Sequence, residues 1–338
     1  MTTTTPIRPL ERSGAPAIDG LSARFFIDGS DYARMAALFS LANEADDIPW
    51  MPTPQQVQLE FDGDDGADLV HDVVLVEVGG RVVAATGVDR AVREGTPTYE
   101  VWGTVDPAFR RRGLGTWLMG WGLDRARERA SREDPLVAVN LGSFSEDNEI
   151  GHRALLAAVG MEPVRHFFLM RRPLSEPIPD APLPDGLDIR PVTQDQWRTI
   201  FDAENEAFRD HWGHREGTDL AFKATYAHDE LDTSLWVVAW DGDQVAGVVQ
   251  NWIWPEENER LGVSRGWLEH ISVRRPWRRR GLARALTAES LVRFRERGLE
   301  EGMLGVDSEN PNGALGLYER LGFTMRSRAA AYRRPLDR

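Results

Sequence analysis

The sequence of 338 residues contains no cysteine, and its 40 basic residues include a single lysine, Lys223. Without cysteine there is no disulfide framework, no thiolate metal site and no thiol nucleophile. No apolar run approaches the roughly 20 residues of a membrane-spanning helix, and the first 20 residues lack the apolar stretch of a secretory signal. We therefore expect a cytoplasmic protein without a membrane partner, in which residues 1–21 form a disordered leader.

The charge balance is acidic, with 54 acidic against 40 basic residues and a formal net charge of −14. A negative surface repels the phosphate backbone, so this balance argues against a general nucleic-acid binder. It weakly favours a cationic small molecule or an amine as the partner.

The chain contains one string twice, as "FRRRGLGTWL" at 109–118 and "WRRRGLARAL" at 277–286. Two further pairs of glycines occur in the same order with a nearly constant offset: Gly80 with Gly242 in hairpin turns, and Gly160 with Gly322 after apolar segments. A repeat of this length indicates a duplicated unit. Two domains of about 150 residues each also suit the length of the chain.

The proline-dense segment 173–186 reads as an extended linker between a first domain at 22–172 and a second at 187–338. Strand and helix patterns alternate within each copy, which predicts an α/β (mixed α+β) fold with a mixed central sheet flanked by helices. In the second copy the strand expected at 266–273 leads through the arginine string into a helix that starts near 282.

The arginine string joins a strand to a helix in both copies, and this context predicts an anion site. Glycine lets the backbone approach a ligand closely, and the first N–H groups of the helix have no partner within it. A pyrophosphate suits such a site. The string matches neither the P-loop nor GxGxxG. The alternative is a solvated basic turn before an ordinary helix, which two matched copies make less attractive.

The strings "RRRGLG" (110–115) and "RRRGLA" (278–283), with "VDP" at 105–107 and "LYERLGF" at 317–323, resemble GNAT-superfamily N-acetyltransferases of the tandem, two-domain type. The resemblance implies acetyl-CoA as co-substrate, bound between two splayed central strands, and direct acetyl transfer to an amine without a metal. The acetyl-CoA-binding residues that it implies in the second copy are Ile271, Val273, Arg278, Arg279, Arg280, Gly281, Leu282, Ala283, Arg284, Asn310 and Asn312. The corresponding second site in the first copy is Val105, Arg110, Arg111, Arg112, Gly113, Leu114, Gly115 and Thr116. The two asparagines depart from the family's spacing, and both could instead cap a helix.

Acetyl transfer requires a base for the ammonium and an acid for the leaving thiolate. The resemblance places Tyr318 as the acid, and its counterpart in the first copy is Leu156. The alternative for Tyr318 is a core-packing aromatic.

For the base, Glu269 lies in the strand "WLEHISV", where residues 269, 271 and 273 are expected to share one face. Its counterpart by counting is Val101. A structural carboxylate is the alternative reading of Glu269. His270 should point to the opposite face unless a bulge re-aims it.

These differences place catalysis in the second copy and leave the first to bind acetyl-CoA or to shape the acceptor cleft. We expect a small-molecule or peptide amine as acceptor, no nucleic acid, and a monomer or homodimer. Acids and aromatics that suit a cationic amine, or that are simply solvated helix faces, are Asp202, Glu204, Glu206, Phe208, Asp210, Trp212, Trp252 and Trp254. Two rival functions stay open: a catalytically silent acyl-CoA-binding or sensing module, and a docking module for a phosphate-bearing partner.

Overall fold

The computed structural model describes residues 7–62, 68–214, 216–310 and 313–337. Contacts divide the chain into two compact units. The first consists of Met1–Val164 with Ala330–Arg338, and the second is Arg165–Ala329. The last residues of the chain thus belong to the first unit, whereas the sequence analysis included them in the second domain at 187–338. Within the described ranges, no helix combines the length and the apolar character needed to cross a membrane.

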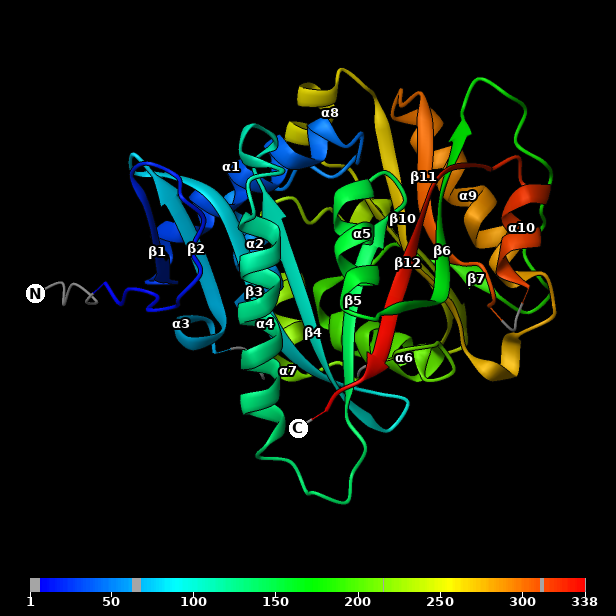
Figure 1. Ribbon diagram of the computed structural model, residues 1–338. Helices are drawn as coiled ribbons and strands as arrows, with labels where there is room; N and C mark the ends of the chain where they lie inside the picture. The colour runs from blue at the N-terminus through cyan, green and yellow to red at the C-terminus, as the bar shows by residue number, and fades with distance from the viewer. Residues whose placement is uncertain (1–6, 63–67, 215, 311–312, 338) are drawn as a thin grey trace, which may run out of the picture. The chain divides into compact units, whose positions relative to one another are not determined.

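The first unit is a mixed sheet flanked by helices (Figure 1). Its strands follow the order β1-β2-β3-β4-β5, with the end of β12 after β5. The strands are β1 (Leu21–Phe25), β2 (Val73–Val78), β3 (Arg81–Arg93), β4 (Thr96–Val105), β5 (Asn140–Glu146) and β12 (Thr324–Pro335). The helices are α1 (Ser30–Ala45), α2 (Pro54–Asp62), α3 (Leu69–Asp72), η1 (Pro107–Phe109), α4 (Leu114–Ala130) and α5 (Ile150–Ala158).

The second unit repeats this plan in the strand order β6-β11-β10-β9-β8-β7. The strands are β6 (Glu162–Pro173), β7 (Asp188–Ile189), β8 (Val237–Asp241), β9 (Gln244–Trp252), β10 (Arg265–Val273) and β11 (Glu301–Asp307). The helices are η2 (Gln194–Gln196), α6 (Trp197–Phe208), α7 (Asp219–Tyr226), η3 (Thr233–Leu235), α8 (Pro255–Leu261), η4 (Arg275–Trp277), α9 (Leu282–Glu296) and α10 (Ala314–Arg320). The mixed α/β fold expected from the sequence is confirmed.

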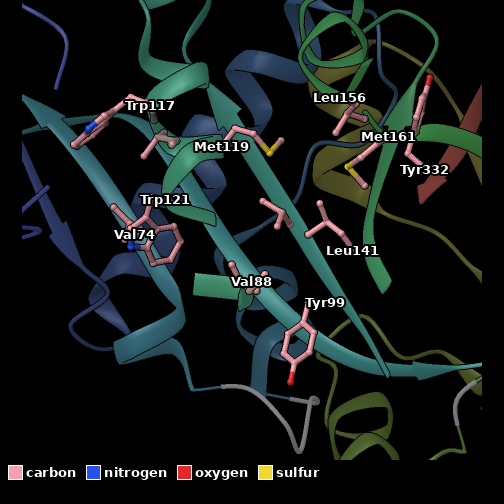
Figure 2. Packing of buried hydrophobic residues seen from close by; sticks show 14 of the residues in the cluster. Val74, Val88, Tyr99, Trp117, Met119, Trp121, Leu141, Leu156, Met161 and Tyr332 are labelled. Carbon is pink, nitrogen blue, oxygen red and sulfur yellow. The ribbon is translucent and has the colours of Figure 1, made fainter. Parts of the chain in front are cut away.

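Each sheet is covered on both faces. In the first unit, one core contains the buried side of α4, including Trp117 and Trp121, and Figure 2 shows the Trp121 indole beside Val74. Aromatic side chains of this size bury about 150–250 Å² each. A second core packs the α1 side of the same sheet around Phe39 and Leu75. The second unit has the same two layers, one with α9 and the other with α6.

The two segments without predicted structure also make defined contacts. Residues 7–20, assigned to the leader, include Pro9, which bridges to Arg24, and Arg12, whose guanidinium lies 2.6 Å from the Asp124 carboxylate. In the proline-rich segment, Leu174 is buried in the core of the second unit, and Ile178 packs against that core.

Candidate active site

In each unit two parallel central strands pair briefly and then separate. β4 pairs with β5 from Thr98 to Glu100, although β4 continues to Val105. β10 pairs with β11 from Arg265 to Trp267, although β10 continues to Val273. Beyond these short ladders the described residues of the two strands are no longer paired with each other. This is the splayed pair that the sequence analysis expected.

The two arginine loops have the same backbone conformation at equivalent positions. Arg111 and Arg279 both have φ of 61°, and the following Gly113 and Gly281 have φ of 89° and 87°. Left-handed φ is strained for arginine but favourable for glycine. The first intrahelical bonds run from Trp117 N to Gly113 O in α4 and from Ala285 N to Gly281 O in α9. The preceding N–H groups therefore have no partner within the helix, as the anion site requires.

The first arginine of each loop is engaged within the protein. Arg110 donates to both carboxylate oxygens of Asp46 at 2.6 and 2.7 Å, and its Nε donates to Val105 O. Arg278 repeats the arrangement with Asp210 at 2.5 Å and with Val273 O. These two arginines connect the loop to the chain just after α1 in the first unit and just after α6 in the second. The exposed arginines that follow them are better placed to meet a ligand.

The loop of the first unit borders a cavity of about 450 Å³. Its lining includes Val105, Arg111, Gly113, Gly115 and Thr116, which the sequence analysis assigned to a second acetyl-CoA site. Glu149 and His152 of the α5 segment also line it. The sequence did not single out these two residues. The structure thus brings the predicted loop residues together around an open cavity.

In the second unit the candidate base lies beside a β-bulge. Glu269 pairs with Gln250 of β9, and the next regular pair joins Ser272 to Val248, so β10 has one residue more than β9 between them. His270 has φ of 40° there. A bulge of this kind bends the strand and leaves the extra residue outside the ladder.

The bulge changes which side chains share a face. Ile271 and Val273 pack against the core on the α9 side. Gln250, the cross-strand partner of Glu269, faces α6 instead, because its amide donates to Glu204 of that helix. The expectation that residues 269, 271 and 273 lie on one face is therefore wrong.

The electrostatic setting of Glu269 suits a proton acceptor. Its burial, together with the negative charge of Glu257, raises its pKa to about 7. Glu257 itself is held by Arg265, whose guanidinium lies 2.8 Å from the carboxylate. A carboxyl with a pKa near 7 can both take up and release a proton at neutral pH.

The same bulge alters the correspondence between the two copies. Ala84 pairs with Val105 in the first unit, and Gly247 pairs with Val273 in the second. The ladder between β3 and β4 runs from these positions without interruption, whereas β10 carries its extra residue. Counting along the sequence, which assumes no insertion, therefore fails within this strand.

Three residues further along the ladder, Gly87 pairs with Trp102, and Gln250 pairs with Glu269. The structural counterpart of Glu269 is thus Trp102, and the expected Val101 is wrong. A Cβ at Gly87 would lie 2.4 Å from the Trp102 ring, so the indole occupies the space above this glycine. The Trp102 indole of the first unit thus takes the place of the polar pair Glu269 and Gln250 in the second.

The candidate acid and its counterpart occupy equivalent places. Tyr318 O accepts from Phe323 N at 3.0 Å, and Leu156 O accepts from Met161 N at 3.0 Å. Both side chains are buried, and Figure 2 shows Leu156 close to Met161 in the core of the first unit. Burial raises the pKa of the Tyr318 phenol, which keeps it protonated at neutral pH.

Most acids expected near the acceptor form ion pairs. Asp202 pairs with Arg198 at 2.9 Å, Glu206 with Arg274 at 2.7 Å, and Asp210 with the arginine loop. Trp252 and Trp254 stack with centroids 4.9 Å apart, and Trp212 contacts the Phe167 ring.

Of the two candidate asparagines, Asn310 lies in a turn in which its carbonyl accepts from Gly313 N at 3.0 Å. Asn312 lies outside the described residues.

Two segments of the chain, residues 35–139 and 197–323, match the Acetyltransferase (GNAT) family, one in each copy. The chain belongs to this family and is an N-acetyltransferase with two GNAT regions. It is 30% identical over 316 residues to a mycothiol acetyltransferase of Catenulispora acidiphila, which covers 90% of this chain and 95% of the relative. A mycothiol acetyltransferase of Salinispora arenicola is 34% identical over 235 residues, or 68% of this chain and 71% of the relative.

Solved structures agree with the tandem arrangement. A GCN5-related N-acetyltransferase from Sphaerobacter thermophilus superposes with a TM-score of 0.68 at 27% identity, over 95% of this chain and 97% of that one. A tandem GNAT protein from the clavulanic acid biosynthesis pathway shares the fold, with a TM-score of 0.64 at 18% identity over 98% and 99% of the two chains. The resemblance to tandem GNAT proteins is therefore confirmed.

Proposed function

We propose that the chain moves an acetyl group from acetyl-CoA directly to a primary amine, and that the second unit does the chemistry. The observation that carries this proposal is the inequality of the two units. Both have the left-handed arginine loop, but Glu269 and Tyr318 of the second unit are replaced by Trp102 and Leu156 in the first.

Glu269 and Tyr318 each carry out one proton-transfer step of the proposed reaction. Glu269 takes the proton of the acceptor ammonium, directly or through a water, because its pKa of about 7 leaves it partly ionised at neutral pH. The freed amine attacks the thioester carbonyl, so that the C–N bond forms and the C–S bond breaks. Hydrogen-bond donors such as backbone N–H groups would stabilise the tetrahedral oxyanion. Tyr318 gives its phenolic proton to the leaving thiolate. The second proton that the nitrogen loses as the amide forms goes to solvent, from which Tyr318 is reprotonated.

The acetyl-CoA pyrophosphate is proposed to bind the N–H groups that open α9, helped by the exposed Arg279 and Arg280. Loop residues 281–284 and the strand residues Ile271 and Val273 would border the rest of the co-substrate. We propose that the matching loop and cavity of the first unit bind a second acetyl-CoA, which is not turned over because the acid and the base are absent there.

Paired loop variants test the two binding sites independently. Glutamate at Gly113 or Gly281 would place a negative charge and a strained left-handed side chain at the anion site. We expect calorimetry to find two acetyl-CoA per chain in the wild type and one in each of Gly113→Glu and Gly281→Glu. Unchanged binding in Gly113→Glu would remove the proposed site in the first unit.

The relatives are named mycothiol acetyltransferases, so the acceptor to try first is an amine precursor of mycothiol. Thiol release from acetyl-CoA should be followed over a panel of amino-sugar conjugates, aminoglycosides, polyamines and short peptides. Amine-dependent release with one class supports the proposed function and identifies the acceptor. Binding of acetyl-CoA without release on any amine would favour the acyl-CoA-binding module instead.

A further inference from the structure

Glu204 differs from the other acids of α6. Asp202 and Glu206 form ion pairs with arginines. The Glu204 side chain is only 6% exposed, and within the described residues its Oε1 has no hydrogen-bond partner. Its Oε2 accepts a hydrogen bond from the amide of Gln250. A buried carboxyl with a free oxygen costs stability and therefore requires an explanation.

The free oxygen of Glu204 faces the bulge of β10. Oε1 lies 3.9 Å from Nδ1 of His270, whose imidazole also contacts the Phe208 ring at 5.8 Å. The left-handed backbone at His270 turns the imidazole towards α6, on the same side as Gln250. For a non-glycine residue this conformation costs on the order of 1 kcal/mol, and such strain is typical of functional sites.

We propose that Glu204 is a positioning residue for acetyl transfer, which acts as a neutral carboxylic acid on His270 and Gln250. Oε1–H donates to His270 Nδ1 when the occupied site draws the two atoms together, and Oε2 continues to accept from Gln250. The inference rests on the proposed function, because it assigns a role beside the proposed base, Glu269.

This arrangement fixes both neighbours of the reacting amine. With its Nδ1 occupied as an acceptor, His270 is neutral, carries its proton on Nε2 and presents no positive charge to the incoming ammonium. Gln250 stays directly opposite Glu269, where cross-strand Cβ atoms are about 4.5–5.5 Å apart. Glu204 thereby holds the two side chains beside the proposed base, Glu269, in place without touching substrate.

The surroundings favour the neutral form of Glu204. Burial raises its pKa well above the usual range, and the hydrogen bond from Gln250 offsets this only in part. The titratable groups nearby are Tyr226 of α7, which is partly buried and whose pKa is raised by burial, and His270 and Glu269 of β10. Beyond them lie Glu257 of α8, next to Glu269, and His211, whose ring meets Phe208 at 4.5 Å. None of these supplies Glu204 with a cation as close as the arginines that pair its neighbours on the helix.

The first unit lacks the whole cluster. Asp46 and Asp210 hold the equivalent loop arginines. Counting the same number of residues back from each gives Ser40 in the first unit as the counterpart of Glu204. Ser40 is 1% exposed, so this position is buried in both units. Gln250 corresponds to Gly87 in the ladder. The buried acid and its amide partner are thus both absent from the unit that lacks the proposed base.

Two substitutions separate a neutral positioning acid from the alternatives. In Glu204→Gln the amide N–H can donate to His270 and the amide oxygen can accept from Gln250, so we expect kcat within about threefold of the wild type. In Glu204→Leu both bonds are lost, and we expect kcat to fall roughly tenfold or more with KM for acetyl-CoA unchanged. The exposed variant Asp219→Asn, at the start of α7, is the charge-neutralising control and should leave both constants unchanged.

The pH profile gives a second readout that a packing role would not move. In the wild type, ionisation of Glu204 at alkaline pH removes the hydrogen bond donated to His270, so kcat should decline there. Glu204→Gln cannot ionise, and this decline should be absent. A Gln variant as impaired as the Leu variant, or a Leu variant with wild-type kcat, would overturn the proposal.

A double-mutant cycle covers the case in which Glu204→Leu does not fold. If Glu204 acts through His270, Glu204→Gln should abolish the alkaline decline in the wild-type background and change nothing further in His270→Ala. Additive effects in the two backgrounds would contradict the inference. A wild type that acetylates no amine would instead refute the proposed function, so the two failures are distinguishable.

Discussion

The Tyr318→Phe variant should retain its affinity for acetyl-CoA and lose tenfold or more in kcat, because only the proton for the leaving thiolate is removed. The substitution deletes one oxygen from a side chain that is 6% exposed and packs edge-on against Phe323. The ring contacts survive, so the fold should tolerate it. Steady-state thiol release with a good acceptor, together with calorimetric acetyl-CoA binding, measures the two quantities separately.

The matched control is Tyr332→Phe in the first unit. Tyr332 is equally buried at 6% exposure, and its phenol oxygen accepts from Arg153 Nε at 3.3 Å. Its loss should cost the free energy of one hydrogen bond, about 1 kcal/mol, and leave kcat unchanged. Equal turnover in the Tyr318 variant and the wild type would show that Tyr318 is a core-packing aromatic.

The parts of the fold that follow from periodic patterns were predictable from the sequence. The hairpin turn expected at Gly242 joins β8 to β9, and the helix expected near 282 begins at Leu282. The short helix α8 was missed, since "PEENERL" offers no apolar face. The membership of Ala330–Arg338 in the first unit was not predictable either, because the strand pattern does not say which sheet a final strand joins.

The candidate site also contains features that could be predicted from the sequence and features that could not. The repeated arginine loop was predictable because its glycines and arginines are adjacent in the sequence, and the two copies have nearly the same φ values. The bulge at His270 was not visible, since one extra residue in a strand leaves the composition unchanged and shifts every later side chain to the other face. The role of Gln250 could not be predicted either, because its position opposite Glu269 depends on the strand register that the bulge sets.

Glu269→Gln should lower kcat by about a hundredfold, within the range expected for the loss of a general base, and should remove the acid limb of the pH profile. In the wild type, kcat should rise as the pH passes through about 7, where Glu269 ionises. The glutamine variant has no such group, so its residual rate should not follow this titration. A profile that retains the limb in the variant would assign the ionisation to another group.

The same substitution has an effect on stability that does not depend on catalysis. The pKa of Glu269 is higher in the folded protein, about 7, than the usual 4.5, so the folded state binds more protons between these values. The free energy of unfolding therefore falls as the pH rises through this window. The full shift corresponds to roughly 3 kcal/mol, and partial exposure of the side chain reduces it.

Glu269→Gln should accordingly match the wild type in stability below pH 4.5, where both side chains are neutral, and exceed it above pH 7. Denaturant unfolding at pH 4 and pH 8 measures the two differences. The exposed Asp202→Asn is the control, because its carboxylate pairs with Arg198 at the surface, where such pairs contribute about 0–1 kcal/mol. Equal stability of Glu269→Gln and the wild type at both pH values would mean that Glu269 titrates as an ordinary carboxyl. The acid limb would then have to arise elsewhere.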